Sequence, residues 1–282
     1  MPKTTWIRLL ALSLALAGLW TALTQPQPPA DLTVEKIYDD LHVIVGGGGN
    51  VGVYTTPEGV ILVDDKFDQH VPQILAKVKT ITDQPVRYVL NTHHHGDHTG
   101  GNKRLLEANA EIVLHRNARA NMVRLNQPGA PRITFSDETA VHLGGKEVRA
   151  RHFGFGHTNG DALILFPERK VLHAGDLFVA SAPFIDYSAG GSGVAWTETL
   201  KAALPLDFDT VIPGHGPVMK RADLEKFIKN LETVRQRISD LRRQGRSKEE
   251  VAQQLRIEDL GWKPSQFWTG RSLPGLYDEL AR

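Results

Sequence analysis

The chain has 282 residues, of which 41% are apolar, so it can bury a substantial core as one large domain or two small ones. Its 33 Lys and Arg residues nearly balance its 32 Asp and Glu residues, and the net charge of +1 provides no overall field that would favour nucleic acid or an anionic membrane surface. The absence of cysteine excludes disulfides, thiolate nucleophiles and Cys-ligated zinc, which leaves nitrogen and oxygen atoms, chiefly those of twelve histidines, for any metal site.

Residues 1–30 are typical of an export signal and a linker. A basic start precedes an apolar run from Leu9 to about Leu23, and a Pro-rich stretch at 25–29 follows. The run is short for a membrane span, and the linker would detach it from any folded core. Because no clear cleavage site follows the run, an uncleaved membrane anchor is the alternative. We therefore predict an exported protein, periplasmic or secreted, in which only this segment contacts a membrane.

Short strands and helices alternate from residue 41 onward. Segments 41–45, 51–55 and 60–64 are β-rich, are separated by Gly or Pro, and predict consecutive antiparallel strands. Apolar residues at helical spacing predict a helix over 69–80, and a compact apolar strand follows at 86–90. Further helices are predicted at 102–109 and 118–125, on either side of a strand at 112–114.

The second half repeats this scheme without a repeat in the sequence itself. Strands are predicted at 139–143, 146–153, 162–166 and 171–173, a helix at 197–204 and a strand at 210–212. We assign 31–220 to the main domain and 221–282 to a C-terminal helical extension, which begins with an amphipathic helix. Its basic residues, including Arg242, Arg243 and Arg246, are interpreted as a solvated face. The aromatic segment 262–277 shows no periodicity and is expected to pack back onto the body.

Metal-ligand side chains gather at 91–101, directly after the apolar strand that ends at residue 90. In an extended stretch His93 and His95 point to one side and His94 to the other, so the first two imidazoles can share a cation. Asp97 and His98 follow a glycine and can reach a second position nearby. A purely structural role would require several crowded, mutually repelling histidines, so this motif predicts a metal site.

Three later positions complete the pattern, each on a turn after a predicted strand. They are His157, Asp176 and His215, and each lies next to a glycine, which allows close approach of the backbone. A single histidine of this kind is usually structural. Their joint occurrence, in this order after His-x-His-x-Asp-His, is the specific signal.

Over residues 41–219 this pattern resembles the metallo-β-lactamase superfamily. The resemblance implies an α+β fold, a four-layer αββα sandwich with the metals at one edge between two sheets, here with a C-terminal helical appendage. It also implies two zinc ions per chain. The first would be held by His93, His95 and His157, the second by Asp97, His98 and His215, with Asp176 bridging the two.

The resemblance assigns no metal to His94. Metal-bound imidazoles need a hydrogen-bond acceptor, and we predict supporting roles for Asp64 and His173. Two zinc ions that share a water would lower its pKa, so that hydroxide can attack a carbonyl polarised by one zinc. Asp97 would orient this nucleophile and is the predicted catalytic residue. No Gly-x-Ser-x-Gly motif suggests a serine nucleophile instead.

Export favours a small molecule outside the cytoplasm as substrate, and a β-lactam is the leading candidate for a cyclic amide or ester. The bridging Asp176 is of the kind seen in thioesterases and lactonases, so hydroxyacylglutathione thioesterase and acyl-homoserine lactonase activities are alternatives. A mononuclear iron sulfur dioxygenase and a non-catalytic periplasmic accessory protein are more distant ones. An RNA-processing nuclease is disfavoured because the chain has no basic excess or aromatic–basic platform.

The segment 177–193 follows Asp176 and should border the metals, although a plain surface connection is the alternative. Phe184 would provide an apolar wall for a substrate, and Tyr187 or Ser192 could donate a hydrogen bond to a carboxylate or an oxyanion. The predicted partner is therefore a small-molecule substrate and not a nucleic acid. The sequence does not determine the oligomeric state.

Overall fold

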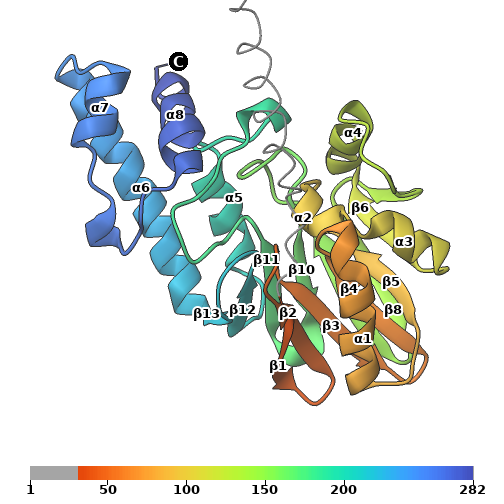
Figure 1. The fold of residues 1–282 in the computed structure, drawn as a ribbon. Coiled ribbons are helices and arrows are strands. Elements are labelled where there is room, and N and C mark those ends of the chain that lie inside the picture. Colours follow the sequence, from red (N-terminus) through yellow and green to blue (C-terminus); the bar gives the residue numbers. More distant parts are fainter. Residues whose placement is uncertain (1–30, 282) are drawn as a thin grey trace, which may run out of the picture.

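A computed structural model describes residues 31–281, so the predicted signal and linker at 1–30 lie outside the described residues. Two β-sheets face each other in the centre of the molecule, and helices cover both outer sides (Figure 1). The predicted four-layer αββα sandwich is therefore confirmed, as is the presence of C-terminal helices. Among the helices of the described residues, none is both long and apolar enough to cross a bilayer.

The first sheet contains seven strands in sequence order. They are β1 (Thr33–Tyr38), β2 (Leu41–Val45), β3 (Val51–Thr56), β4 (Gly59–Val63), β5 (Val86–Leu90), β6 (Glu111–His115) and β7 (Ile133–Phe135). The first four are antiparallel neighbours, and β4 to β7 run parallel. The sequence analysis missed β1 and β7, because both are edge strands and most of their residues are exposed or partly exposed, which gives them a weak hydrophobic pattern.

The second sheet has the order β13-β12-β11-β10-β9-β8. Its strands are β8 (Glu138–Leu143), β9 (Lys146–Arg151), β10 (Leu163–Phe166), β11 (Val171–Gly175), β12 (Thr210–Pro213) and β13 (Met219–Lys220). Only β11 and β12 pair in parallel; the other neighbours are antiparallel. The ends of β11 and β12 therefore point the same way, and the turns that follow them meet at one edge.

Alternating side chains of the strands pack into separate layers. In β2, Val43 belongs to the core between the sheets, whereas Ile44 belongs to the core beneath the outer helices. Between the sheets, the rings of Tyr54 and Phe166 meet edge to face with centroids 5.2 Å apart. This dry interface holds the two halves together, and the metal-ligand motifs lie at its rim.

Helices cover the two outer faces (Figure 1). On the first sheet lie α1 (Val71–Ile81) and α3 (Asn102–Glu107), with α2 (Gly96–Thr99) and α4 (Arg116–Arg124) near its end. On the second lie α5 (Trp196–Ala203) and α6 (Arg221–Arg243). Short 3-10 turns are η1 (Asp68–His70), η2 (Pro167–Arg169), η3 (Tyr187–Ala189) and η4 (Glu258–Leu260).

The C-terminal extension continues with α7 (Lys248–Gln254), the π-helical turn η5 (Trp268–Ser272) and α8 (Leu273–Glu279). The side chains of Trp262, Trp268 and Leu276 are buried in the same core cluster as α5 and α6. The expectation that segment 262–277 packs onto the body is confirmed. This packing brings the end of the chain close to the segment 177–193.

Candidate metal centre

The seven predicted ligands converge at the edge between the two sheets. Four of them follow β5 of the first sheet, and His157, Asp176 and His215 follow β9, β11 and β12 of the second. The approach is so close that only glycine fits beside it: a Cβ at Gly214 would lie 1.9 Å from Asp176 Oδ1. A side chain at position 214 would collide with Asp176, so the turn before His215 requires glycine there.

The ligand atoms of the first group, which contains His93, His95, His157 and Asp176, lie within 4.8 Å of one another. The Nδ1 atom of His95 lies 3.1 Å from His93 Nε2 and 2.8 Å from His157 Nε2. Asp176 Oδ2 lies 3.6 Å from His157 Nε2. Three imidazole nitrogens and one carboxylate oxygen are therefore gathered as the resemblance implied.

The second group adjoins the first. His98 Nε2 and His215 Nε2 are 3.4 Å apart, and Asp97 Oδ2 lies 3.5 Å and 3.2 Å from them, respectively. Asp176 turns its other oxygen, Oδ1, toward this group, at 3.3 Å from His98 Nε2 and 3.4 Å from His215 Nε2. One carboxylate thus faces both groups, which is the placement that a bridging ligand requires.

Acceptors outside the cluster determine which nitrogen of each imidazole carries the proton. His157 Nδ1 donates to the carbonyl of Phe184 at 2.6 Å, and His98 Nδ1 donates to Asp64 Oδ2 at 2.7 Å. His95 Nε2 donates to Asp186 at 2.9 Å. Each donation leaves the opposite nitrogen, which faces the cluster, with a lone pair.

Asp64 acts on His93 through an intermediate hydroxyl. Thr92 Oγ1 donates to Asp64 Oδ2 at 2.8 Å, so it can only accept from His93 Nδ1, 3.0 Å away. The Nε2 atom of His93 therefore also presents a lone pair to the cluster. Lone pairs and carboxylates at these distances repel one another unless cations lie between them, so the donor set fits a metal centre.

Electrostatics favour the ligating forms of His93, His157 and Asp176. Burial, followed by repulsion from His98, holds the pKa of His93 well below its usual value, and burial lowers the pKa of His157 to about 4. Burial opposes the ionisation of Asp176, but His215 and His98 outweigh it and lower that pKa well below the ordinary range. Neutral imidazoles and an ionised carboxylate are the states that bind a metal.

In the second group burial disfavours charged imidazoles, but Asp97 and Asp176 outweigh it. They raise the pKa of His98 well above its usual value and the pKa of His215 to about 9. A metal there would therefore displace a proton from each.

The predicted supporting residues occupy different positions. Asp64 is fully buried and also accepts from the backbone N–H of Thr92 at 2.7 Å, so it is linked to one histidine of each group, to His93 through Thr92 and to His98 directly. His173 lies farther out and contacts no ligand side chain through its hydrogen bonds: it donates to the carbonyl of Asn50 at 3.1 Å.

Asn50 is a positioning residue that the sequence analysis missed. Its side-chain amide donates to the carbonyls of Pro213 and Gly216 at 2.9 Å and 2.8 Å, and its backbone N–H donates to Gly214 at 2.8 Å. A residue of the loop between β2 and β3 of the first sheet thus holds the turn that follows β12 of the second sheet and carries His215. The only sequence signal was its place after four consecutive glycines.

His94 is buried, and neither of its ring nitrogens has a hydrogen-bond partner within the part of the chain that the structure describes. It lies beside His95, with ring centroids 4.6 Å apart, and forms a further set of potential ligand atoms with His95 and Asp186. Because His95 Nε2 already donates to Asp186, we interpret this set as support for His95.

A cleft of about 650 Å³ opens over the two groups of ligands. Phe184 lines it, as predicted, and stacks on His95 at 5.9 Å between centroids. Tyr187 and Ser192 are absent from the described lining, and both hydroxyls donate to Glu279 of α8 instead. The structure therefore gives these two side chains a role in holding the C-terminal extension and provides no support for their predicted contact with substrate.

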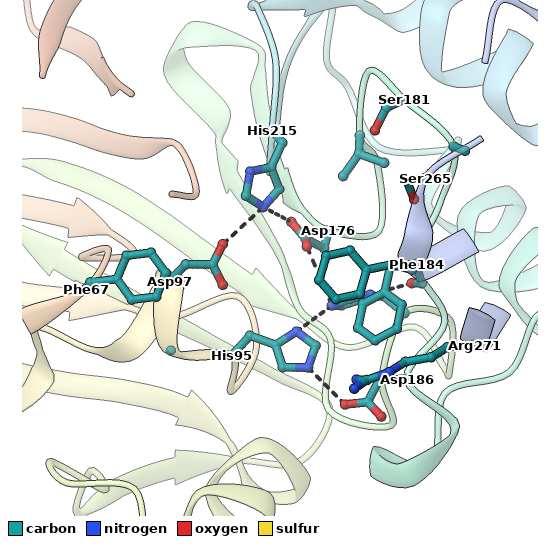
Figure 2. A pocket seen from close by; sticks show the side chains of 15 residues that line it. Phe67, His95, Asp97, Asp176, Ser181, Phe184, Asp186, His215, Ser265 and Arg271 are labelled. Atoms are coloured by element: carbon teal, nitrogen blue, oxygen red, sulfur yellow. Dashed lines mark hydrogen bonds and ion pairs between the residues drawn. The ribbon is translucent and has the colours of Figure 1, made fainter. Parts of the chain in front are cut away.

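Several lining residues were not foreseen. Asp186 faces the cleft beside His95, and Ser265, Phe267 and Arg271 enter it from the C-terminal extension (Figure 2). Their positions depend on how the extension docks. No sequence motif in segment 262–277 predicted that these residues would line the cleft.

Comparison with known proteins gives consistent similarities. The model of the metallo-beta-lactamase superfamily matches residues 44–215. A metallo-beta-lactamase type 2 of Bacillus cereus is 28% identical over 60% of this chain and 67% of its own length. A hydroxyacylglutathione hydrolase of Crocosphaera subtropica is 33% identical over 37% of each chain, so the alignments cover only part of these relatives. The fold of a metallo-beta-lactamase from Pontibacter korlensis matches with a TM-score of 0.64 at 23% identity, over 72% of this chain and 99% of that one.

Replacing Asp64 by Asn should weaken metal binding about 10- to 100-fold, because an amide cannot accept from Thr92 and His98 as the carboxylate does. The measurement is the zinc that remains bound at graded chelator concentrations. Asp68→Asn, at an exposed ion pair with Arg104, is the control and should retain zinc like the wild type. Equal retention by folded Asp64→Asn protein would contradict this role.

Proposed function

The chain belongs to the metallo-beta-lactamase superfamily, and from this premise we propose that it is an exported dinuclear zinc hydrolase that cleaves a cyclic amide or ester, with β-lactams as the leading substrates. The observation that carries the proposal is the pair of adjoining ligand groups that share Asp176. A donor set of imidazoles and carboxylates without sulfur is suited to zinc. Bound there, two zinc ions would supply Lewis acidity and lower the pKa of a shared water.

The chain's own contribution centres on Asp97. Its contacts with His98 and His215 use Oδ2, which leaves Oδ1 to accept a hydrogen bond from an attacking water. The carboxylate lines the cleft, so it can orient that water toward a carbonyl held there. Desolvation opposes its ionisation, but His98 and His215 outweigh this and lower the pKa of Asp97 to about 2, so it remains an acceptor at neutral pH.

Aromatic side chains favour a substrate with an apolar or cyclic portion. Phe67 borders the cleft from the first half of the chain and Phe184 from the second (Figure 2). The relative from Bacillus cereus is named as a metallo-beta-lactamase, which supports β-lactams as the first compounds to test. A small molecule of this kind fits a cleft of about 650 Å³.

A hydroxyacylglutathione thioesterase is the second candidate. The C-terminal helices that border the cleft and the similarity to a hydroxyacylglutathione hydrolase favour it. A lactonase would use the same ligands. A mononuclear iron sulfur dioxygenase and a non-catalytic accessory protein are weaker candidates, since two complete groups of ligands exceed what either requires.

The export signal is part of the proposal and rests on the sequence alone. Residues 1–30 fused to alkaline phosphatase, an enzyme that folds actively only outside the cytoplasm, should produce activity in a bacterial host. A control with Leu14→Arg and Leu16→Arg interrupts the apolar run and should abolish that activity. A wild-type fusion retained in the cytoplasm would refute export.

Metal analysis combined with a substrate panel tests the activity. The purified protein should hold close to two zinc ions per chain and should hydrolyse a β-lactam faster than a lactone, a glutathione thioester or a phosphodiester. Zinc-free protein with full activity on one iron would favour the dioxygenase. Preferred thioester cleavage would establish the second candidate.

The variant Asp97→Ala should lower kcat by roughly 10²- to 10⁴-fold, because it removes a group that acts mainly in the transition state. Thermal unfolding of the metal-free variant should change little. Asp83→Ala removes a highly exposed carboxylate just after the C-terminal end of α1 and should leave both kcat and thermal unfolding unchanged. Near-normal turnover in folded, zinc-loaded Asp97→Ala protein would remove this residue from the mechanism.

A further inference from the structure

One wall of the cleft comes from a part of the chain that the family model does not cover. The model matches residues 44–215, whereas Phe267 and Arg271 lie in the C-terminal extension and line the cleft with Asp186 (Figure 2). The rings of Phe267 and Phe184 are 5.4 Å apart between centroids. The extension is therefore part of the site and not only a covering of the second sheet.

This wall is firmly attached to the segment 177–193. Glu279 accepts from Tyr187 Oη and Gly193 N at 2.9 Å each, from Val194 N at 3.3 Å, and from Ser192 Oγ. A carboxylate with this many donors holds α8 in one place. Its position is thus determined by the fold before any ligand binds.

A second anchor lies within the wall itself. Ser272 Oγ accepts from the backbone N–H of Ile185 at 2.9 Å, next to Phe184. Ser272 ends the π-helical turn η5, which begins at the buried Trp268. Such turns are uncommon and frequently occur at functional sites. Here the turn keeps Trp268 in the core while Phe267 and Arg271 line the cleft.

Arg271 differs from the other arginines of the extension. The guanidinium groups at 221, 235, 237, 242, 243, 246 and 256 each donate at least one hydrogen bond. Within residues 31–281, no hydrogen bond or ion pair involves Arg271; its guanidinium lies 5.9 Å from the ring centroid of Phe267.

The nearby carboxylate does not serve as its partner. Asp186 Oδ2 accepts from His95 Nε2, and its Oδ1 accepts from Ser188 N, Ser188 Oγ and Ala189 N. Among residues 31–281, Arg271 is also the only Lys or Arg that lines this cleft. An unpaired guanidinium thus faces the cleft with its donors available.

We propose that Arg271 binds a carboxylate of the substrate while an apolar ring packs against the contacting pair Phe184 and Phe267 and against Phe67; this rests on the proposed hydrolase function. The fork of a guanidinium matches a carboxylate in a bidentate manner. Arg271 therefore selects substrates of the class that combines a hydrolysable carbonyl, an apolar ring and a carboxylate.

The test compares substrates that differ only in this charge. With benzylpenicillin, Arg271→Ala should lower kcat/KM about 10- to 100-fold, mainly through KM, because it removes a hydrogen-bonded charge pair. With benzylpenicillin methyl ester the same variant should stay within about twofold of the wild type. Arg271→Lys keeps the charge but not the planar fork of the guanidinium, so its kcat/KM with benzylpenicillin should lie between those of the wild type and Arg271→Ala. Arg243→Ala, an arginine of the extension outside the cleft, is the matched control and should leave both substrates unaffected.

The outcomes separate this inference from the proposed function. Equal loss for acid and ester, or no loss for either, overturns the role of Arg271 even if the enzyme is an efficient hydrolase. If the panel identifies a thioesterase, the same comparison is made with a phenylacetyl thioester of mercaptopropionate and its methyl ester.

If the zinc-loaded wild type hydrolyses no compound, binding provides the readout. Quenching of tryptophan fluorescence should show tighter binding of phenylacetate than of phenylacetamide, and Arg271→Ala should reduce that difference about tenfold. The zinc ions contribute equally to both proteins, so they cancel in this comparison. An unchanged preference in the variant would overturn the inference.

Discussion

The constraint on which the site depends is the mutual repulsion of the groups that face its centre. Four imidazole nitrogens with lone pairs, together with the carboxylates of Asp97 and Asp176, lie within a few ångströms of one another. A free peptide would relieve this repulsion by turning the rings or by moving the ring protons inward. The folded chain restrains His95, His98 and His157, because each of these rings donates an outer proton, to Asp186, Asp64 and the Phe184 carbonyl respectively. The donor atoms gathered in the centre are therefore suited to cations.

The sandwich makes such an arrangement feasible. The ligands stand on turns at the ends of strands in both sheets, and the dry interface between the sheets keeps those ends at a constant separation. Asn50 adds a direct polar link across the edge, from the first sheet to the turn that carries His215. The two halves of the metal centre are therefore joined twice, by the apolar core below them and by hydrogen bonds beside them.

The C-terminal extension supplies one wall of the cleft. Polar side chains of segment 177–193 that could have faced a substrate are engaged by Glu279 instead. The extension also places Phe267 and Arg271 in the lining of the cleft, and Arg271 has no hydrogen bond or ion pair within residues 31–281. The proposed metal ligands and the proposed carboxylate-binding arginine thus come from different parts of the chain.

The sequence by itself determined the layers, most of the strands and helices, and all seven proposed ligands. Hydrophobic periodicity is a local property, and the spacing of His93, His95, Asp97 and His98 is dictated by the short-range geometry of one loop. Only the tertiary structure decided the remaining roles. Asn50 and Asp186 contact groups far away in the sequence, Arg271 reaches the cleft only because the C-terminal extension docks there, and Tyr187 donates to Glu279 because α8 packs beside it. Such contacts depend on how whole elements pack, which no local pattern encodes.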